Sequence, residues 1–267
     1  MSKICFITAN YGKYEETCKK FEEQTIPTDK ICFTDNPNLI SNGWTIDTTP
    51  YHLTHKSDLD NDSQINSICN NKHTFNIAKY YKQAFQNIPI LKKYDVIVWV
   101  DGTIEIIYNK VSEYILRHVS SQKIITWHHE HRHGFLEHEV MASNFYRYTS
   151  TFWNNQAQPF QDVFKQYSDY RTDGYTNDFF KQVPRHTPHF GVWLTCFVAF
   201  DNKDGNVSNF LNKWYTETLI HTTQDQISFP YVCYKTNMIP MTLPNDEISG
   251  DLPHQNTMFY IKKPHGQ

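Results

Sequence analysis

The sequence lacks the patterns that define several common classes of protein. Among its 267 residues there is no G-x-G-x-x-G string and no Walker A string, which argues against a Rossmann dehydrogenase and a P-loop enzyme. No segment is long and apolar enough to span a bilayer, and the chain enters a strand pattern without the apolar stretch of a signal peptide. The net charge of −3 predicts no chain-wide attraction to nucleic acid or to an anionic membrane.

The cysteines lack disulfide or metal spacing. Six are present, and none belongs to a C-x-x-C pair. Cys5, Cys32 and Cys196 lie in apolar, strand-like runs, which indicates buried free thiols in a reducing compartment. We therefore expect a soluble, cytoplasmic protein.

The most informative segment is Val96 to Thr103. Five consecutive β-branched or aromatic residues predict a fully buried strand, which ends at Asp101-Gly102. In an open α/β sheet, ligands bind outside the carboxyl ends of the strands, so Asp101 is placed to hold a metal ion or a sugar. The competing interpretation is a simple Asp-Gly turn. Aromatic residues make up 15% of the chain, which suits sugar recognition but also suits a packed core.

The order of the predicted elements indicates a single α/β domain. Strands are expected at 4–8, 30–34, 44–47 and 96–100, and a helix is expected at 14–21. Beyond residue 128 the chain becomes more aromatic and polar, and later returns to strand and helix patterns. This change of character divides the single domain into two halves, 1–127 and 128–267.

Polar residues follow several of these strands. If the strands are parallel, their ends line one edge of the sheet as a nucleotide crevice, although each residue alone also has a turn or cap explanation. The residues are Thr8, Asn10, Gly12, Thr34, Asp35 and Asp101. Lys72 and Lys79 lie two helical turns apart, which suits a diphosphate or an ordinary solvated face.

Two later segments carry further candidate residues. His128 to His133 looks like a metal cluster, but adjacent side chains diverge, so substrate contacts from His129, Arg132 and one following acid, Glu137 or Glu139, or a plain solvated loop, are favoured. Trp193 is added as an aromatic ring suited to a sugar face. Asp225 and Gln226 begin a predicted helix. They either stabilise its N-terminus or bind sugar hydroxyls and accept the acceptor's proton. His254 and His265 lie in a polar tail that either closes over a metal–diphosphate site or frays.

Several motifs, in this order, resemble a glycosyltransferase-like family of plant, bacterial and viral proteins formerly catalogued as a domain of unknown function. They are Ile7 to Gly12, Cys32 to Asp35, Val98 to Thr103, His129 to Arg132, and Gln224 to Phe229, the most specific. The family typically has Arg where this chain has Gln224.

The resemblance implies a GT-A-like mixed sheet, in which 1–127 is the nucleotide-sugar-binding half and 128–267 the acceptor-binding half. It also implies transfer of a sugar from a nucleotide-diphosphate donor to a hydroxyl acceptor, such as a glycan. By position, Asp101 matches an acid that binds a divalent cation, Mn²⁺ or Mg²⁺, and we expect Thr103 and His254 to complete that site. Thr103 stands where GT-A enzymes keep the second acid of Asp-x-Asp. The alternatives are a sugar nucleotidyltransferase and a non-catalytic glycan-binding domain derived from a transferase.

Overall fold

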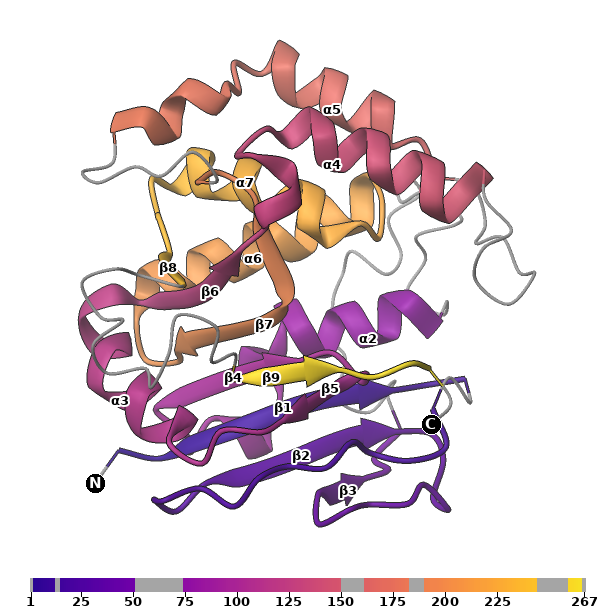
Figure 1. Cartoon of the computed structure of the whole chain (residues 1–267), viewed down its shortest axis with the longest axis vertical. Helices are drawn as coiled ribbons and strands as arrows, with labels where there is room; N and C mark the ends of the chain where they lie inside the picture. Colours follow the sequence, from indigo (N-terminus) through magenta and orange to yellow (C-terminus); the bar gives the residue numbers. More distant parts are fainter. Residues whose placement is uncertain are drawn as a thin grey trace.

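The computed structural model describes residues 2–12, 15–50, 74–149, 161–182, 190–243 and 259–265, which form a mixed seven-stranded β-sheet with helices on both faces (Figure 1). The strand order is β3-β2-β1-β4-β7-β6-β8. Strand β7 is antiparallel to both of its neighbours, and the other adjacent pairs are parallel. The predicted α/β class with a mixed sheet is therefore confirmed.

The strands of the main sheet are β1 (Ile4–Asn10), β2 (Asp29–Thr34), β3 (Thr45–Asp47), β4 (Val96–Val100), β6 (Ile124–His128), β7 (Trp193–Asp201) and β8 (Met241–Leu243). A separate two-stranded sheet pairs β5 (Ile104–Ile106) with β9 (Tyr260–Lys262). The α-helices are α2 (Thr74–Gln83), α3 (Val111–Gln122), α4 (Leu136–Ser143), α5 (Val163–Thr172), α6 (Gly205–Ile220) and α7 (Asp225–Thr236). Short 3₁₀ segments lie at η3 (Phe85–Asn87), η4 (Pro89–Leu91), η5 (Glu130–Arg132) and η7 (Asn177–Gln182), and η6 (Asn144–Thr149) is a π-helix.

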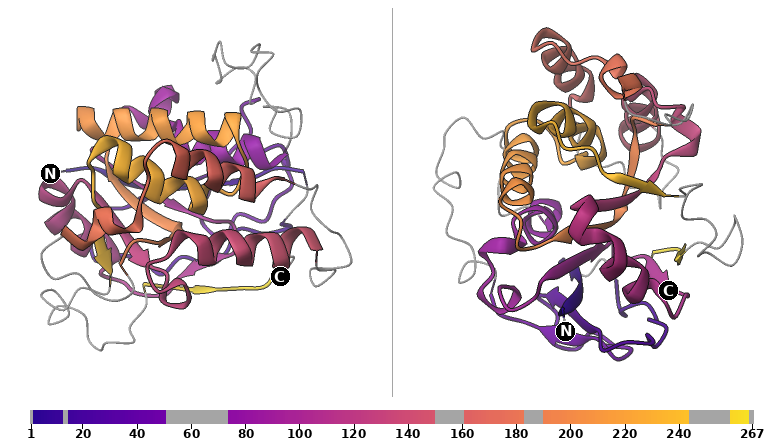
Figure 2. Two further views of the ribbon diagram at one scale, coloured as in Figure 1. Left: turned by 90° about the horizontal axis from the view of Figure 1, so that it is seen from above. Right: turned by 90° about the vertical axis from the view of Figure 1, so that its left-hand side faces the viewer.

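The central strands are apolar because both faces of the sheet are covered. All seven residues of β1 and all five of β4 are buried. Alternate residues of β4 serve opposite faces, so that Ile97 and Trp99 pack under α2, α6 and α7, whereas Val98 packs with α3 and the β5–β9 sheet. Figures 1 and 2 show these layers from three sides. A continuous apolar run is the pattern expected for such a doubly covered strand.

The topology brings the predicted strand-end residues together. The carboxyl ends of the parallel strands β1, β2, β4 and β6 point to one edge of the sheet. Because β7 runs the other way, its first residues lie at that same edge, and the Asp101 amide donates to the Cys196 carbonyl at 2.9 Å. The edge predicted as a ligand crevice therefore collects side chains from both predicted halves of the chain.

The predicted helix at 14–21 is wrong. Residues 15–21 form an extended segment that crosses the sheet face, bridging Thr17 to Ile40 and Phe21 to Ile106. The indole of Trp44 donates to the Lys19 carbonyl at 2.9 Å, and the Phe21 ring packs edge-on against Phe6. Tertiary contacts thus override the local helical pattern of this segment.

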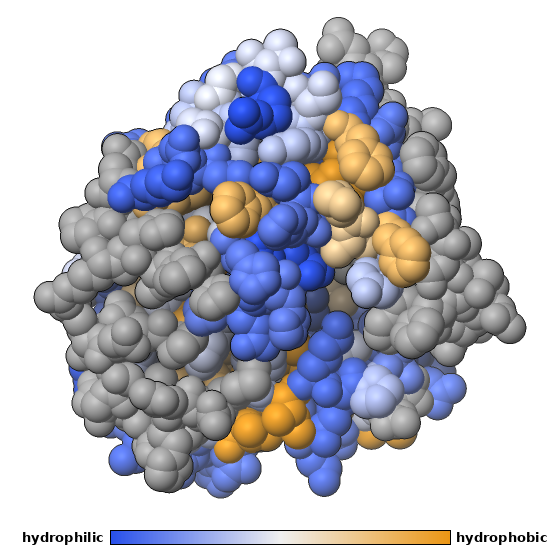
Figure 3. Space-filling view, turned by 45° about the horizontal axis from the view of Figure 1, so that its top comes forward, coloured by the Kyte–Doolittle hydropathy of each residue, from blue (hydrophilic) through white to orange (hydrophobic). Residues whose placement is uncertain are grey.

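No helix in the described part of the chain is long and apolar enough to cross a membrane. In Figure 3, hydrophobic side chains appear as separate patches on a largely hydrophilic face. The exposed hydrophobic residues of α4 and η6 are Met141, Phe145 and Tyr146.

Candidate functional site

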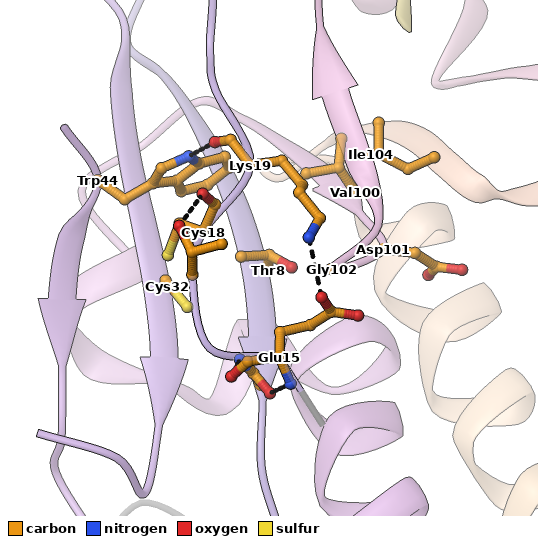
Figure 4. A pocket seen from close by; sticks show the side chains of 12 residues that line it. Thr8, Glu15, Cys18, Lys19, Cys32, Trp44, Val100, Asp101, Gly102 and Ile104 are labelled. Carbon is orange, nitrogen blue, oxygen red and sulfur yellow. Dashed lines mark hydrogen bonds and ion pairs between the residues drawn. The ribbon is translucent and has the colours of Figure 1, made fainter. Parts of the chain in front are cut away.

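Asp101 lies at the carboxyl end of β4 and lines a small pocket there, with its carboxylate pointing away from Glu15 and Lys19 (Figure 4). Its side chain is 43% exposed. One carboxylate oxygen, Oδ1, accepts a hydrogen bond from the Trp99 indole at 2.7 Å and also lies 3.5 Å from Lys82 Nζ. Both groups anchor Oδ1 and so fix the orientation of the carboxylate.

Lys82 is a buried ammonium group held between two carboxylates. Its side chain is 1% exposed, and Nζ lies 2.6 Å from Asp225 Oδ2 and 3.3 Å from the Thr195 hydroxyl. The indole rings of Trp99 and Trp214 each lie 5.7 Å from Nζ, within the range of a cation–π contact. Helix α2 thus delivers a fixed positive charge to the sheet edge.

Asp225 begins helix α7 and binds two ammonium groups. Lys79 Nζ lies 2.9 Å from Oδ1, and Lys82 contacts Oδ2. Burial by itself would raise the pKa of Asp225, but the charges of Lys79 and Lys82 outweigh burial and lower it to about 2. Burial lowers the pKa of Lys79 despite its contact with Asp225. It would also lower the pKa of Lys82, but Asp101 and Asp225 together raise it.

A second set of predicted residues lines a small pocket beside Asp101 (Figure 4). Thr8 and Asn10 of β1 line this pocket, together with the buried Glu15 and Lys19, which form an ion pair at 2.9 Å. The Thr8 hydroxyl is buried and has no hydrogen-bond partner among the residues that the structure describes. Asn10 is already used locally, since its amide donates to the Glu15 carbonyl at 2.8 Å and its oxygen accepts from the Glu15 amide at 3.2 Å.

The ends of β1 and β2 are tied to one another. The amide of Gly12 donates to both oxygens of Asp35 at 3.2 Å. Gly12 has a φ of 72°, a left-handed conformation that favours glycine. The Thr34 hydroxyl accepts from the Asn36 amide at 3.0 Å. Gly12, Thr34 and Asp35 therefore lie at the predicted edge, and their hydrogen bonds hold the loops that follow β1 and β2.

The His129–Arg132 segment forms its own polar cluster. Arg132 Nε contacts Glu139 Oε2 at 2.6 Å, and His129 Nε2 lies 3.9 Å from the same oxygen. Glu137 turns elsewhere, to the Asn177 amide at 2.8 Å and the Tyr167 hydroxyl at 3.1 Å. The resemblance carries over Glu137 with His129 and Arg132, but Glu139, the alternative register, is the acid that joins them in the structure.

The cation site predicted at Asp101, Thr103 and His254 stays a prediction, because the described residues include only the first two. They contain no group of three His, Cys, Asp or Glu side chains arranged to hold a metal ion. Thr103 is buried, and its carbonyl accepts the Lys263 amide at 2.8 Å. His254 and the predicted diphosphate ligand Lys72 lie outside the described residues, so their roles stay predictions.

His129 to His133 reads H-E-x-x-H, the zinc spacing that needs both histidines on one face of an α-helix. Here the segment is a 3₁₀ turn, η5, that ends at His133 in a left-handed conformation. The local backbone therefore does not provide the helix that this zinc motif requires.

Three further residues predicted from the sequence, Trp193, Gln226 and His265, lie in the described part of the chain. Trp193 is fully buried, donates its indole N–H to the Thr242 hydroxyl at 2.8 Å, and packs against Phe180 and Phe229. This is a core position rather than a surface suited to a sugar. Gln226 is half-buried, and its oxygen accepts the Thr195 amide at 3.4 Å. His265 lies with its Nδ1 2.6 Å from Glu15 Oε1, so the tail returns to the site.

Sequence reasoning missed Lys82, Glu15 and Lys19. A signal for Lys82 existed, because Lys79 and Lys82 are three residues apart on one helix and share a face. In the sequence analysis above, Lys79 is paired with Lys72 instead. Glu15 and Lys19 carry no usable signal in the sequence, because a helix is predicted for residues 14–21.

Comparison with known proteins yields matches only among solved structures. No protein-family model and no curated protein matches the sequence. The chain is similar in structure to the bifunctional glycosyltransferase WbbM in its apo form, with 9% identity and a TM-score of 0.43 over 90% of this chain. It spans 38% of the length of that WbbM chain. It is also similar to apo mouse xyloside xylosyltransferase 1, with 7% identity and a TM-score of 0.45, covering 91% of this chain and 84% of the other.

Proposed function

We propose that this protein is a GT-A-type glycosyltransferase that moves a sugar from a nucleotide-diphosphate donor to a hydroxyl acceptor. The observation that carries the proposal is the charged cluster at the sheet edge. In this cluster Lys79 and Lys82 both contact Asp225, and Lys82 also lies 3.5 Å from Asp101. The cluster lies beside the strand-end pocket that contains Thr8 and Asn10. This is the edge at which open α/β sheets bind nucleotides. The order of the five motifs supports the same assignment.

The arrangement suits departure of a diphosphate. In the transfer, the bond between the sugar's anomeric carbon and the diphosphate oxygen breaks, and its electron pair stays on the diphosphate. The acceptor oxygen bonds to the same carbon and releases its proton to the surrounding water. Buried positive groups aimed at the departing oxygen stabilise the charge that develops there. Lys79 is partly exposed, at 18%, and is the ammonium group nearest to solvent in the cluster.

Asp225 is better suited to orientation than to proton transfer. A carboxylate with a pKa of about 2, in contact with two ammonium groups, is a weak base at neutral pH. We therefore assign it the task of holding Lys79 and Lys82 toward the crevice. Gln226 holds the Thr195 backbone beside it.

The test is a screen of nucleotide sugars for release of nucleoside diphosphate, with each donor supplied in the presence and absence of Mn²⁺. We expect release from at least one uridine or guanosine diphosphate sugar, and loss of that release in Lys79→Met. Lys165→Met is the matched control, because Lys165 is an exposed lysine on α5 paired with a single aspartate at 2.6 Å.

The same screen separates the alternatives. A sugar nucleotidyltransferase would consume a nucleoside triphosphate and release pyrophosphate instead. A glycan-binding domain would release nothing from any donor. Either result would overturn the proposal.

A further inference from the structure

The predicted divalent cation conflicts with the charges that the structure already places around Asp101. Asp101 and Asp225 are the two carboxylates of the cluster, and Lys79 and Lys82 are its two ammonium groups, so the four charges balance. A cation site that attracts Mg²⁺ or Mn²⁺ normally offers uncompensated oxygen ligands. Asp101 offers one oxygen, Oδ2, because Oδ1 is engaged by Trp99 and lies 3.5 Å from the Lys82 ammonium.

From this charge balance we infer that Lys82 serves as a fixed cationic site for the donor's diphosphate, in the place that a divalent cation would take. The inference rests on the proposed function and names the group that stabilises its leaving group. Lys82 comes from α2, faces the sheet edge and is 1% exposed.

The surroundings of Lys82 hold a cation in place. Its ammonium has three N–H donors and three oxygen neighbours, at 2.6 Å on Asp225, 3.3 Å on Thr195 and 3.5 Å on Asp101. The Trp99 and Trp214 rings flank it. An ammonium held so firmly needs no rearrangement when negative charge develops next to it, which is the condition for strong electrostatic stabilisation.

One of the three neighbours is exchangeable. The contact with Asp101 is the longest, and Asp101 is 43% exposed, whereas Asp225 is 7% exposed. A phosphate oxygen that approaches along the exposed side of Asp101 therefore replaces Asp101 as the third partner of Lys82 and leaves the Asp225 and Thr195 contacts intact. Asp101 then competes with the diphosphate for Lys82, which is opposite to the role of a metal ligand.

If Asp101 is a metal ligand, its removal should weaken binding of the nucleotide, whereas if Asp101 competes for Lys82, its removal should strengthen it. Binding of UDP and of GDP is measured by titration calorimetry, once in EDTA and once with Mn²⁺. We expect one of them to bind in EDTA as well as it does with Mn²⁺, and Asp101→Asn to bind it more tightly in EDTA than the unmodified protein does. Loss of binding in Asp101→Asn, or binding only with Mn²⁺, overturns the inference and leaves the proposed function standing.

Variants of lysines complete the experiment. Lys82→Met keeps the aliphatic stem and removes the charge, and we expect its dissociation constant to rise at least about tenfold, because a charge-assisted hydrogen bond is lost. Lys123→Met is the matched control, since Lys123 also bridges two aspartates, Asp201 at 3.1 Å and Asp204 at 3.2 Å, but at the opposite edge of the sheet.

Unchanged binding in a folded Lys82→Met also overturns the inference. If Lys82→Met does not fold, as judged by circular dichroism, the Asp101→Asn result decides alone, because that residue is partly exposed and its variant keeps its shape. Failure of both nucleotides to bind under either condition overturns the proposed function itself.

Discussion

Lys82 of helix α2 contacts Asp225, the first residue of helix α7, at 2.6 Å, and both side chains are at least nine-tenths buried. The contact is a buried ion pair between the two predicted halves of the chain. Lys79 adds a second ammonium to the same carboxylate. A buried carboxylate with two ammonium partners should contribute more to the free energy of unfolding than a surface ion pair does, and this difference can be measured.

Asp225→Asn removes the carboxylate's charge and leaves two ammonium groups near the core without their shared counterion. We expect the free energy of unfolding to fall by about 3–5 kcal/mol, the usual cost of breaking a buried ion pair from one side. Urea denaturation followed by circular dichroism measures this change.

The control is Asp169→Asn on α5, where Lys165 and Asp169 form an exposed pair at 2.6 Å. An exposed pair contributes less than about 1 kcal/mol, so this variant should unfold close to the unmodified protein. Equal losses of unfolding free energy in Asp225→Asn and Asp169→Asn would show that burial does not determine how much the Asp225 contacts contribute to stability.

Acid should remove the contribution of Asp225 in a defined range. Its pKa is about 2 in the folded protein and 3.8 in an unperturbed side chain, so the folded state binds the proton less tightly. The resulting stabilisation of about 2 kcal/mol is fully present above the unfolded pKa and is lost as the pH falls through the folded pKa. Between pH 6 and pH 2, the difference in unfolding free energy between the unmodified protein and Asp225→Asn should therefore shrink by about 2 kcal/mol. A constant difference across that range would contradict the assignment of the low pKa to this residue.

Much of the fold could be predicted from the hydrophobic pattern of the sequence. The run Val96–Val100 is apolar throughout because both faces of β4 are covered, and this property is visible without a structure. The edge at Asp101 follows from the same strand and from the polar residues after β1 and β2. Parallel pairing of β1 with β2 and β4 then brings these residues together.

Contacts between residues that are far apart in the sequence could not be predicted. Lys82 looks like an ordinary helical lysine, and only the packing of α6 and α7 against α2 shows that it is buried. The segment 15–21 has helix-like spacing, yet its contacts with Ile40 and Ile106 keep it extended. Trp193 looked suited to a sugar because an aromatic residue in a strand pattern does not reveal which face it packs on.

The acid that serves Arg132 illustrates a register problem that only the structure resolves. Glu139 is 6% exposed, contacts Arg132 at 2.6 Å and accepts the Ser143 hydroxyl at 3.1 Å. Glu139→Gln leaves the guanidinium without its counterion, and we expect a loss of about 1–3 kcal/mol in unfolding free energy. Glu137→Gln is the comparison, since its partners, Asn177 and Tyr167, are uncharged. A greater loss in Glu137→Gln than in Glu139→Gln would reverse the assignment of the two acids.

His129 should remain neutral well below the pH at which an exposed histidine takes up a proton. Burial lowers its pKa to about 3, and the positive charge of Arg132 and the neighbouring His131 and His128 act in the same direction, although Glu139 lies 3.9 Å from Nε2. Its other ring nitrogen, Nδ1, is buried, and none of the described residues offers it an acceptor that would stabilise a second N–H. Proton binding is therefore weaker in the folded state than in the unfolded state, and the protein loses stability from this group as the pH falls from about 6.5 toward 3.

Nuclear magnetic resonance of the imidazole nitrogens measures this directly. The His129 signals should stay in the neutral form from pH 7 to pH 4, while those of His131, which is 74% exposed, provide the comparison within the same segment. His129→Gln should then lose less stability than the unmodified protein between pH 6 and pH 4, because glutamine has no proton to gain. A His129 midpoint near 6.5 would mean that water reaches the ring, and that the cluster with Arg132 and Glu139 is open in solution.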